Sequence, residues 1–248
     1  MHILLTNDDS HDSPLFLFTI RILKELGEVT VVVPAQEQSW KGKSMTRFGA
    51  LYVDRIDLHG TPAWSVSGTP ADCVNLAIYN LMDVRPDIVV SGINIGTNTG
   101  LAFFMASGTL GACFEANIAR IPAIALSQWM TYQDHEQWNS ERSFNPESLA
   151  RMEQNVRTLM PSIWKYVERL DTPTTWSFNL PDHLNDTDIV RARLGHTFYG
   201  QCFTQRGDQY HHSLQRFDID QAPDSDQAVV FTGRASATHI DITQIGQH

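Results

Sequence analysis

Short apolar runs alternate with helical periodicity at the start of the chain. Residues 1–6 and 29–33 are continuous apolar stretches of strand length, and the second is mostly valine. Residues 15–26 between them carry apolar side chains at helical spacing. Continuous apolar runs are typical of strands that are covered on both faces in a parallel sheet. The pattern therefore predicts a strand, a helix and a second strand.

The same order continues to residue 126. Strands are predicted at 51–53, 64–66, 87–91 and 123–126, helices at 71–81 and 108–117, and a loop rich in glycine and asparagine at 92–100. Repeated strand, loop and helix indicate an α/β fold with a doubly wound, mostly parallel, Rossmann-like sheet.

The second half of the chain predicts different elements. Residues 134–146 are polar and read as a surface loop, and residues 146–170 have one apolar face, as in a long helix. Strands are expected at 176–180, 189–194 and 229–231. Without an internal repeat or a clear linker, the prediction is a single domain, 1–248. It consists of an α/β core, 1–180, and a β-rich C-terminal arm, 181–248.

Composition narrows the classes of function. The chain has 248 residues, of which 42% are hydrophobic and 19% charged, so it can bury a full core. Its formal net charge of −10 disfavours binding to a nucleic-acid polymer. No apolar run is long enough for a membrane span and no signal-peptide pattern is present, so a cytoplasmic protein with no membrane partner is expected. Cys73, Cys113 and Cys202 are odd in number and far apart, so they are expected to be reduced and buried.

Three polar loops are predicted at the carboxyl ends of strands, where open α/β sheets bind ligands. Asp8 and Asp9 end the first strand and could gather Mg²⁺ or Mn²⁺, although such residues also form ordinary turns. The loop 92–100 has glycines that let the backbone approach a ligand and asparagines that can offer an amide oxygen or donor, although such loops are common. Residues 107–109 begin a helix, where they serve as a cap or attract an anion. Together these features suit metal-assisted attack on a phosphate ester.

Competing chemistries lack their motifs. The chain contains no P-loop, no G-x-G-x-x-G, no G-x-S-x-G and no H-E-x-x-H. An aspartyl-phosphate phosphatase would need carboxylates one residue apart after the first strand, whereas Asp8 and Asp9 are adjacent.

Several segments occur in an order that resembles the SurE (stationary-phase survival) family of nucleotidases. They are NDD after the first strand, a serine after VVVP, SGTPADC, DIVVSGIN-x-G-x-N, SGT and FNLP. The resemblance is dense to about residue 126 and thinner beyond it. It implies a SurE-like three-layer fold whose arm exchanges between subunits of a homodimer or homotetramer. It also implies a divalent-metal-dependent phosphomonoesterase, a 5′-nucleotidase or acid phosphatase type of hydrolase. The small-molecule substrate would be a nucleoside 5′-monophosphate, with 3′-monophosphates as further candidates.

The resemblance also implies two groups of site residues. The metal ligands would be Asp8, Asp9, Ser39 and Asn94, with Asp8 and Asp9 also catalytic, and the phosphate-binding residues would be Asn7, Asn98, Ser107, Gly108 and Thr109. The cofactor would be Mg²⁺ or Mn²⁺. The SGTPADC segment is interpreted as a helix start at Thr69 or Pro70, and Cys73 is not expected to be a nucleophile.

The chain departs from the family's usual residues close to this site. Ser10 and Trp40 stand where glycine is usual, and Gln38 stands where arginine is usual. After Gly100, residues 101–104 are apolar where the family commonly has two acidic residues. The alternative hypothesis is therefore a catalytically weak metal- or nucleotide-binding protein with altered specificity.

The replacements leave several assignments open. Lys41 and Lys43 are candidates to supply the cation that Gln38 does not. Trp40, Phe103 and Phe104 either form a platform for a flat group or pack in the core or between subunits, and Tyr199 and Phe203 are expected at a subunit contact. Candidates for the general acid are His11, which lies nearest the acidic pair, His196, His211, His212 and His239. The sequence decides neither the general acid, the preferred nucleotide, the metal nor the number of subunits.

Overall fold

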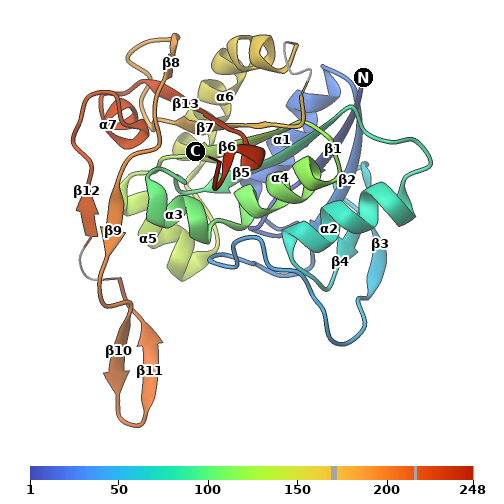
Figure 1. The fold of residues 1–248 in the computed structure, drawn as a ribbon, viewed down its shortest axis with the longest axis horizontal. Coiled ribbons are helices and arrows are strands. Elements are labelled where there is room, and N and C mark those ends of the chain that lie inside the picture. The colour runs from blue at the N-terminus through green and yellow to red at the C-terminus, as the bar shows by residue number, and fades with distance from the viewer. Residues whose placement is uncertain (169–171, 215–216, 248) are drawn as a thin grey trace.

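A nine-stranded, mostly parallel sheet forms the centre of the protein (Figure 1). The computed structural model describes residues 1–168, 172–214 and 217–247. In sheet order the strands are β3 (Val53–Asp57), β4 (Pro62–Val66), β2 (Glu28–Pro34), β1 (His2–Thr6), β5 (Ile88–Ile95), β6 (Ala123–Gln128), β7 (Thr175–Leu180), β13 (Ala235–Ile240) and β8 (Ile189–Arg191). The strands from β4 to β7 are parallel. At the two edges, β3 pairs antiparallel with β4, and β13 pairs antiparallel with β7 but parallel with β8. The predicted α/β class and mostly parallel sheet are confirmed.

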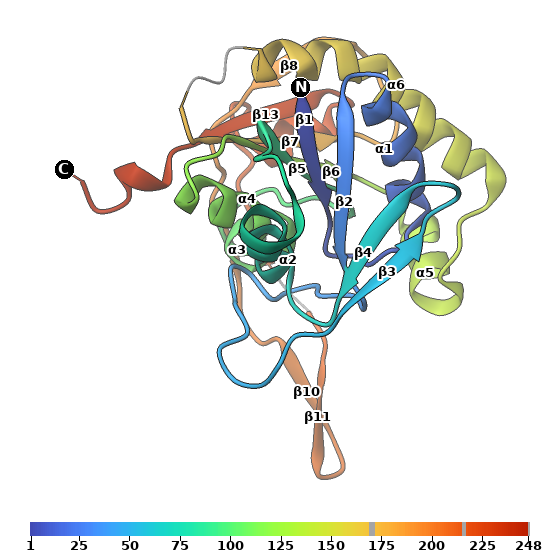
Figure 2. The ribbon, with the colours of Figure 1, turned by 90° about the vertical axis from the view of Figure 1, so that its right-hand side faces the viewer.

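Helices cover both faces of the sheet (Figure 2). One face carries α1 (Pro14–Lys24), α5 (Tyr132–Glu141) and α6 (Pro146–Val167), and the other carries α2 (Pro70–Leu76) with its π-helical extension η1 (Ala77–Leu81), α3 (Leu101–Ala106) and α4 (Gly108–Ile118). Alternate residues of one strand reach opposite layers: Leu5 joins the cluster under α1 and α6, whereas Leu4 joins the cluster under α2 and α4. This is why the strands read as continuous apolar runs.

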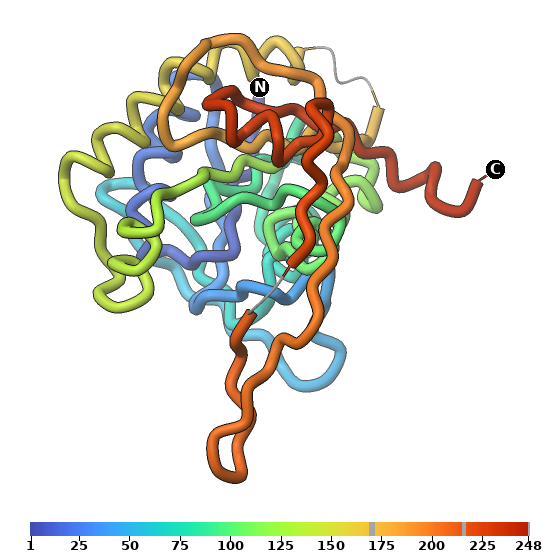
Figure 3. Tube along the Cα trace, turned by 90° about the vertical axis from the view of Figure 1, so that its left-hand side faces the viewer, coloured from blue at the N-terminus to red at the C-terminus, as the bar shows by residue number. Residues whose placement is uncertain are grey.

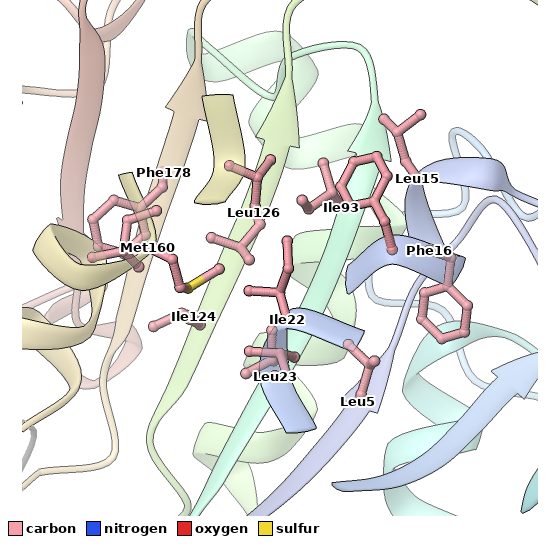
Figure 4. Close-up of a cluster of buried hydrophobic side chains, with 14 of the residues drawn as sticks. Leu5, Leu15, Phe16, Ile22, Leu23, Ile93, Ile124, Leu126, Met160 and Phe178 are labelled. Carbon is pink, nitrogen blue, oxygen red and sulfur yellow. The ribbon is translucent and has the colours of Figure 1, made fainter. Parts of the chain in front are cut away.

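The layer under α1 and α6 is closely packed. Ile22 and Leu23 of α1 and Met160 of α6 lie over Ile124 and Leu126 of β6 (Figure 4). These five side chains are at most 3% exposed. The buried layer holds β1, β5 and β6 in register, so the polar loops at their carboxyl ends start from a rigid edge.

The arm contains strands and one helix. Beyond β8 the chain forms β9 (Thr197–Tyr199), the hairpin β10 (Phe203–Arg206) and β11 (Gln209–His212), β12 (Phe217–Ile219), α7 (Asp226–Phe231), β13 and the short η2 (Ile242–Gln244). The hairpin projects from the body of the protein, as Figures 1 and 3 show.

Two sequence predictions in the second half are wrong. Residues 134–146 were expected in a loop, but 134–141 belong to α5, whose start is capped by Thr131 accepting from the Asp134 N–H at 3.1 Å. The helix is polar except for the buried Trp138, so hydrophobic spacing gave no signal. Residues 229–231, expected in a strand, end α7, because Ser225 caps a helix over the same three apolar residues. Three residues are too few to distinguish the two-residue period of a strand from the 3.6-residue period of a helix.

Smaller differences concern element boundaries and the cysteines. Helix α3 was not predicted, β8 ends at Arg191 rather than at 194, and α6 ends at Val167, with residue 170 outside the described residues. Thr69 caps α2 as expected, with Pro70 at the first helical position. All three cysteines are free, and Cys73 and Cys113 are buried, but Cys202 is half-buried. None of the described helices is long and apolar enough to span a bilayer.

Candidate functional site

The carboxyl ends of β2, β1 and β5, adjacent in the sheet, open into a cavity of about 750 Å³. Six predicted site residues line it: Asp8, Asp9, Ser39, Asn94, Asn98 and Ser107. Asp8, Asp9, Ser39 and Asn98 come from the loops after three neighbouring parallel strands and Ser107 from the start of α4, whereas Asn94 lies within β5, which runs to Ile95 rather than ending at 91 as predicted. The sheet topology brings them together. Asn7, Gly108 and Thr109 are buried and do not line the cavity.

Asp8 and Asp9 lie at the end of β1 and are 3% and 5% exposed. The Thr109 hydroxyl donates to Oδ1 of Asp8 at 2.7 Å, and the Ile95 N–H donates to Oδ2 of Asp9 at 2.8 Å. The backbone N–H of Gln38 also donates to the Asp8 carbonyl oxygen at 2.7 Å. Both carboxylates are therefore fixed from the neighbouring loops.

Burial makes the two carboxylates hard to ionise. Desolvation raises the pKa of Asp8, although the hydrogen bond from Thr109 opposes that change. Burial and the adjacent negative charge of Asp8 raise the pKa of Asp9 well above its ordinary value. Within the described residues, no ion pair joins either carboxylate to a cationic side chain. The site thus has a deficit of positive charge.

Ser39 follows β2 and faces the same cavity. Its hydroxyl donates to Oε1 of Glu37 at 2.8 Å, and the other oxygen of Glu37 pairs with Arg142 at 2.7 Å. Arg142 follows α5, lies over the Trp138 ring at 5.3 Å and lowers the pKa of Asp9 by its charge. The Arg142 guanidinium at the end of α5 therefore lies close enough to the site to act on Asp9 electrostatically.

Asn94 and Asn98 are held in defined orientations. The Asn94 side-chain amide donates to the Gly96 carbonyl at 2.7 Å, which leaves Oδ1 as the end of the amide suited to a cation. The Asn98 side chain donates to Ser127 at 2.8 Å, and its backbone N–H donates to Asn179 at 2.8 Å. Asn179 belongs to the FNLP segment, so that segment supports the site from behind.

The start of α4 faces Asp8. Ser107 caps the helix by accepting from the Leu110 N–H at 3.1 Å. A Cβ atom at Gly108 would lie 2.9 Å from Oδ2 of Asp8, so only glycine allows this approach. The Thr109 hydroxyl and backbone N–H both interact with Asp8, and the Leu110 N–H donates to Ser107. The Ser107 hydroxyl and the Gly108 N–H are the groups of the first turn that remain suited to an anion.

Asn7 and Ser10 shape the turn after β1. The Asn7 amide donates to the Ser10 carbonyl at 2.8 Å, which holds Asn7 within the turn. Ser10 has φ 71°, and Trp40 has φ 62°, so both residues occupy the left-handed region. This conformation explains why glycine suits these two positions.

Several side chains that line the cavity had not been predicted from the sequence as parts of the site. His135, Glu136 and Asn139 come from α5, and Glu37 precedes Ser39. The Asn139 side chain lies 3.1 Å from Nδ1 of His135. The capping pair Thr131 and Asp134 was the available signal for α5, but no local pattern indicates that this helix reaches the cavity.

The other expected cations and general acids lie elsewhere, with one exception. Lys43 pairs with Glu115 at 2.6 Å and does not line the cavity. His11 pairs with Asp12 at 3.4 Å, His196 stacks on Phe198, and His239 meets Thr174. Among the histidines that the sequence singled out, only His212 lines the cavity in the described part of the chain.

The side chains present fit a hard divalent cation. Two carboxylates, a hydroxyl and an amide oxygen are the ligand types that Mg²⁺ and Mn²⁺ prefer. Burial raises the pKa of Asp8 and Asp9, and a cation bound between them would favour their ionised forms. Within the described ranges there is no cluster of three or more His, Cys, Asp or Glu side chains able to hold a metal. Neutral oxygen ligands would therefore have to complete this site.

Fold and site together define an α/β protein with an acidic, oxygen-lined site at the carboxyl edge of its sheet. Residues 3–201 match the family model described as survival protein SurE. The chain is 34% identical to the 5′-nucleotidase SurE of Methanothermobacter thermautotrophicus over 84% of its own length and 78% of that protein. The crystal structure of the SurE protein from Aquifex aeolicus superposes with a TM-score of 0.73 and 27% identity, covering 99% of this chain and 96% of that one.

This chain belongs to the SurE family. A second relative, the 5′-nucleotidase SurE of Methanopyrus kandleri, is 47% identical over 128 residues, which are 52% of this chain. That match spans 49% of the relative, so the chain covers about half of its length.

Proposed function

We propose that the protein is a divalent-metal-dependent phosphomonoesterase that hydrolyses nucleoside 5′-monophosphates, and also 3′-monophosphates, to nucleoside and phosphate. The observation that carries the proposal is the buried pair Asp8 and Asp9, which lacks an ion-pair partner in the described structure and faces a cavity with neutral oxygen ligands. Relatives named 5′-nucleotidase SurE support it.

Asp8, Asp9, Ser39 and Asn94 would hold the cation. When bound, a divalent cation supplies Lewis-acid activation of water and neutralises the charge on the phosphate. Ser39 is oriented by Glu37, and Asp8 by Thr109, so ligand positions are set before substrate arrives.

The phosphate would lie against the start of α4. Ser107 and the Gly108 N–H would donate to the phosphate oxygens. Asn98 lines the same space, and to bind phosphate its side-chain amide would exchange its bond to Ser127 or Thr109 for one to a phosphate oxygen. These donors would stabilise the negative charge of the transition state while water attacks phosphorus and the bond to the nucleoside oxygen breaks. The leaving oxygen must gain a proton, and His135, which lines the cavity, is the donor in this proposal.

The test is phosphate release from nucleoside 5′- and 3′-monophosphates and p-nitrophenyl phosphate, with Mg²⁺, Mn²⁺ or excess chelator. Turnover that needs metal and disappears in a folded Asp9→Asn variant would support the proposal. Absence of release with every metal would overturn it and favour the catalytically weak binding protein.

The proposal extends to assembly and location. We propose one domain, 1–248, in which the arm, 181–248, joins two or four copies. Phe198, Phe203 and Tyr210 expose aromatic rings along the arm, with more than half of each surface accessible. Light scattering of the whole chain beside one that lacks residues 201–212 tests this role.

We also propose a cytoplasmic location, because the three free thiols suit a reducing compartment.

A further inference from the structure

Aromatic rings from three distant segments gather at the cavity. Trp40 follows β2, Phe103 lies on α3, and Tyr199 and His212 belong to the arm. The Trp40 ring centroid is 4.9 Å from His212, 5.5 Å from Tyr199 and 5.9 Å from Phe103. Tyr199 packs on Trp40 of the same chain, and its expected subunit contact stays a prediction. We call these four rings the aromatic wall.

The aromatic wall and the acidic site share one cavity. Trp40, Phe103 and His212 line the same space as Asp8 and Asp9. Trp40 directly follows the predicted metal ligand Ser39, so their Cα atoms are about 3.8 Å apart. A phosphate held at the acidic site would therefore place its leaving group beside these rings.

The arrangement of the rings leaves room for another ring. Trp40 meets His212 and Tyr199 at interplanar angles of 62° and 60° and Phe103 at 79°, so none of them lies flat against it in the described structure. Trp40 is still 42% exposed. An exposed aromatic face beside a polar cavity is suited to stacking of a flat group.

Two of these rings stand on unusual local structure. Trp40 has φ 62°, in the left-handed region where a bulky residue is strained relative to glycine, so the fold holds this ring at the cavity at a cost. Phe103 lies in α3, whose sequence LAFFMA carries no charge, so no carboxylate of this helix repels an anionic substrate that enters beside the ring.

We propose that the aromatic wall is a subsite that selects phosphate esters whose leaving group carries an aromatic ring, namely the base of a nucleotide, over esters of aliphatic alcohols. The proposal rests on the phosphomonoesterase function and names its specificity determinants. Trp40 and Phe103 stack on the base, and His212 closes the wall from the arm.

The experiment compares kcat/KM for AMP, ribose 5-phosphate and 1-naphthyl phosphate in the whole chain. Ribose 5-phosphate keeps the sugar and phosphate without the base, while 1-naphthyl phosphate supplies a ring without the sugar. Stacking on one base predicts a preference of about 5- to 100-fold for AMP over ribose 5-phosphate. A nucleobase site prefers AMP to 1-naphthyl phosphate as well, whereas the reverse order overturns the nucleobase as occupant.

Variants separate recognition from structure. Phe103→Leu keeps apolar volume without a ring, and His212→Ala removes the ring from the arm. In each, we expect the AMP to ribose 5-phosphate ratio to fall several-fold. A merely structural wall would lower both rates and keep the ratio. His211→Ala is the matched control, because this exposed ring lies on the same hairpin outside the cavity.

Binding measurements separate this inference from the nucleotidase proposal. Calorimetric Kd values for AMP and ribose 5-phosphate give the same ratio without turnover. If no substrate releases phosphate but AMP binds more tightly, the nucleotidase proposal fails and the subsite stands. Equal Kd values for the two ligands, with or without turnover, overturn the subsite.

Discussion

The hydroxyl of Thr109 donates to Oδ1 of Asp8 at 2.7 Å and joins the start of α4 to the end of β1. The two residues are 101 positions apart in the chain. Both are buried, and the same Thr109 oxygen lies 3.4 Å from the side-chain nitrogen of Asn98. One hydroxyl therefore orients a predicted metal ligand and lies beside a predicted phosphate ligand.

Thr109→Val keeps the shape of the side chain but removes this donor. An unsatisfied buried carboxylate oxygen costs about 1–3 kcal/mol, so we expect denaturant unfolding to show a loss of that size. Loss of the orienting partner is expected to weaken Mn²⁺ binding about 10- to 100-fold, as measured by calorimetry. Thr109→Ser should behave like the parent. Unchanged Mn²⁺ affinity in the valine variant would contradict the positioning role.

Asp9→Asn should change stability in opposite directions with and without metal. Because burial and Asp8 raise the pKa of Asp9, the parent loses stability as pH rises from the ordinary carboxyl pKa to the raised one. Asparagine does not titrate. In chelator, the variant should therefore have the higher Tm at about pH 8, and the difference should shrink toward about pH 4.

Added Mn²⁺ should reverse that order at high pH. A ligand at 100 times its Kd stabilises the folded state by about 2.7 kcal/mol, and only the parent keeps both carboxylates. Thermal melts of the two proteins across pH, with chelator and with Mn²⁺, provide the measurement. A variant that is less stable than the parent in chelator at every pH would show that Asp9 is not strained by burial.

The sequence predicted the sheet better than the elements that surround the cavity. Strands β1, β2, β5 and β6 were visible because both their faces are buried, which leaves uninterrupted apolar runs. Helix α5 was missed because its only large buried apolar residue is Trp138. Its tertiary contacts, including the pairing of Arg151 with Asp134 at 3.1 Å, join residues too distant for periodicity to show.

The candidate site shows the same division. Asp8 and Asp9 directly follow β1 and Asn94 lies near the end of β5, and parallel topology alone places the carboxyl ends of these strands at one edge. His135 and His212 reach the cavity because α5 and the arm fold back over it. No residue spacing in the sequence predicts that α5 and the arm fold over the cavity. Expectations based on proximity in sequence favoured His11, which points to Asp12 instead.

Asp226 should be a strong anchor of the arm. Its Oδ2 accepts from the Gly100 N–H at 2.9 Å, and its Oδ1 accepts from the N–H groups of Gly195 and Gln227 at 3.0 and 2.9 Å. Asp226→Ala leaves three donors without this acceptor, so we expect a loss of about 2–4 kcal/mol in unfolding.

The isosteric Asp226→Asn variant refines the measurement. Its single carbonyl oxygen can accept either from the Gly100 N–H or from the N–H groups of Gly195 and Gln227, and its NH₂ group then faces the donor that is left. We expect a smaller loss than for alanine and faster hydrogen exchange at the Gly100 or Gly195 amide. Asp224→Asn, at an exposed carboxylate nearby, is the control. Parent-like exchange at both amides in Asp226→Asn would show that the carboxylate does not hold the arm.

His135→Ala should lower turnover according to the leaving group. His135 lines the cavity, and the side-chain nitrogen of Asn139 lies 3.1 Å from its Nδ1, a contact that favours a proton on Nε2 when Asn139 is the donor. A nucleoside alkoxide needs a proton as it leaves, and general acid catalysis is worth about 100-fold or more. The p-nitrophenolate group leaves without one. We therefore expect kcat to fall about 100-fold for AMP and only a few-fold for p-nitrophenyl phosphate.

His211→Ala, at an exposed position outside the cavity, should leave both rates unchanged. Equal losses on both substrates in His135→Ala would mean that this histidine positions the substrate and that the proton comes from another donor.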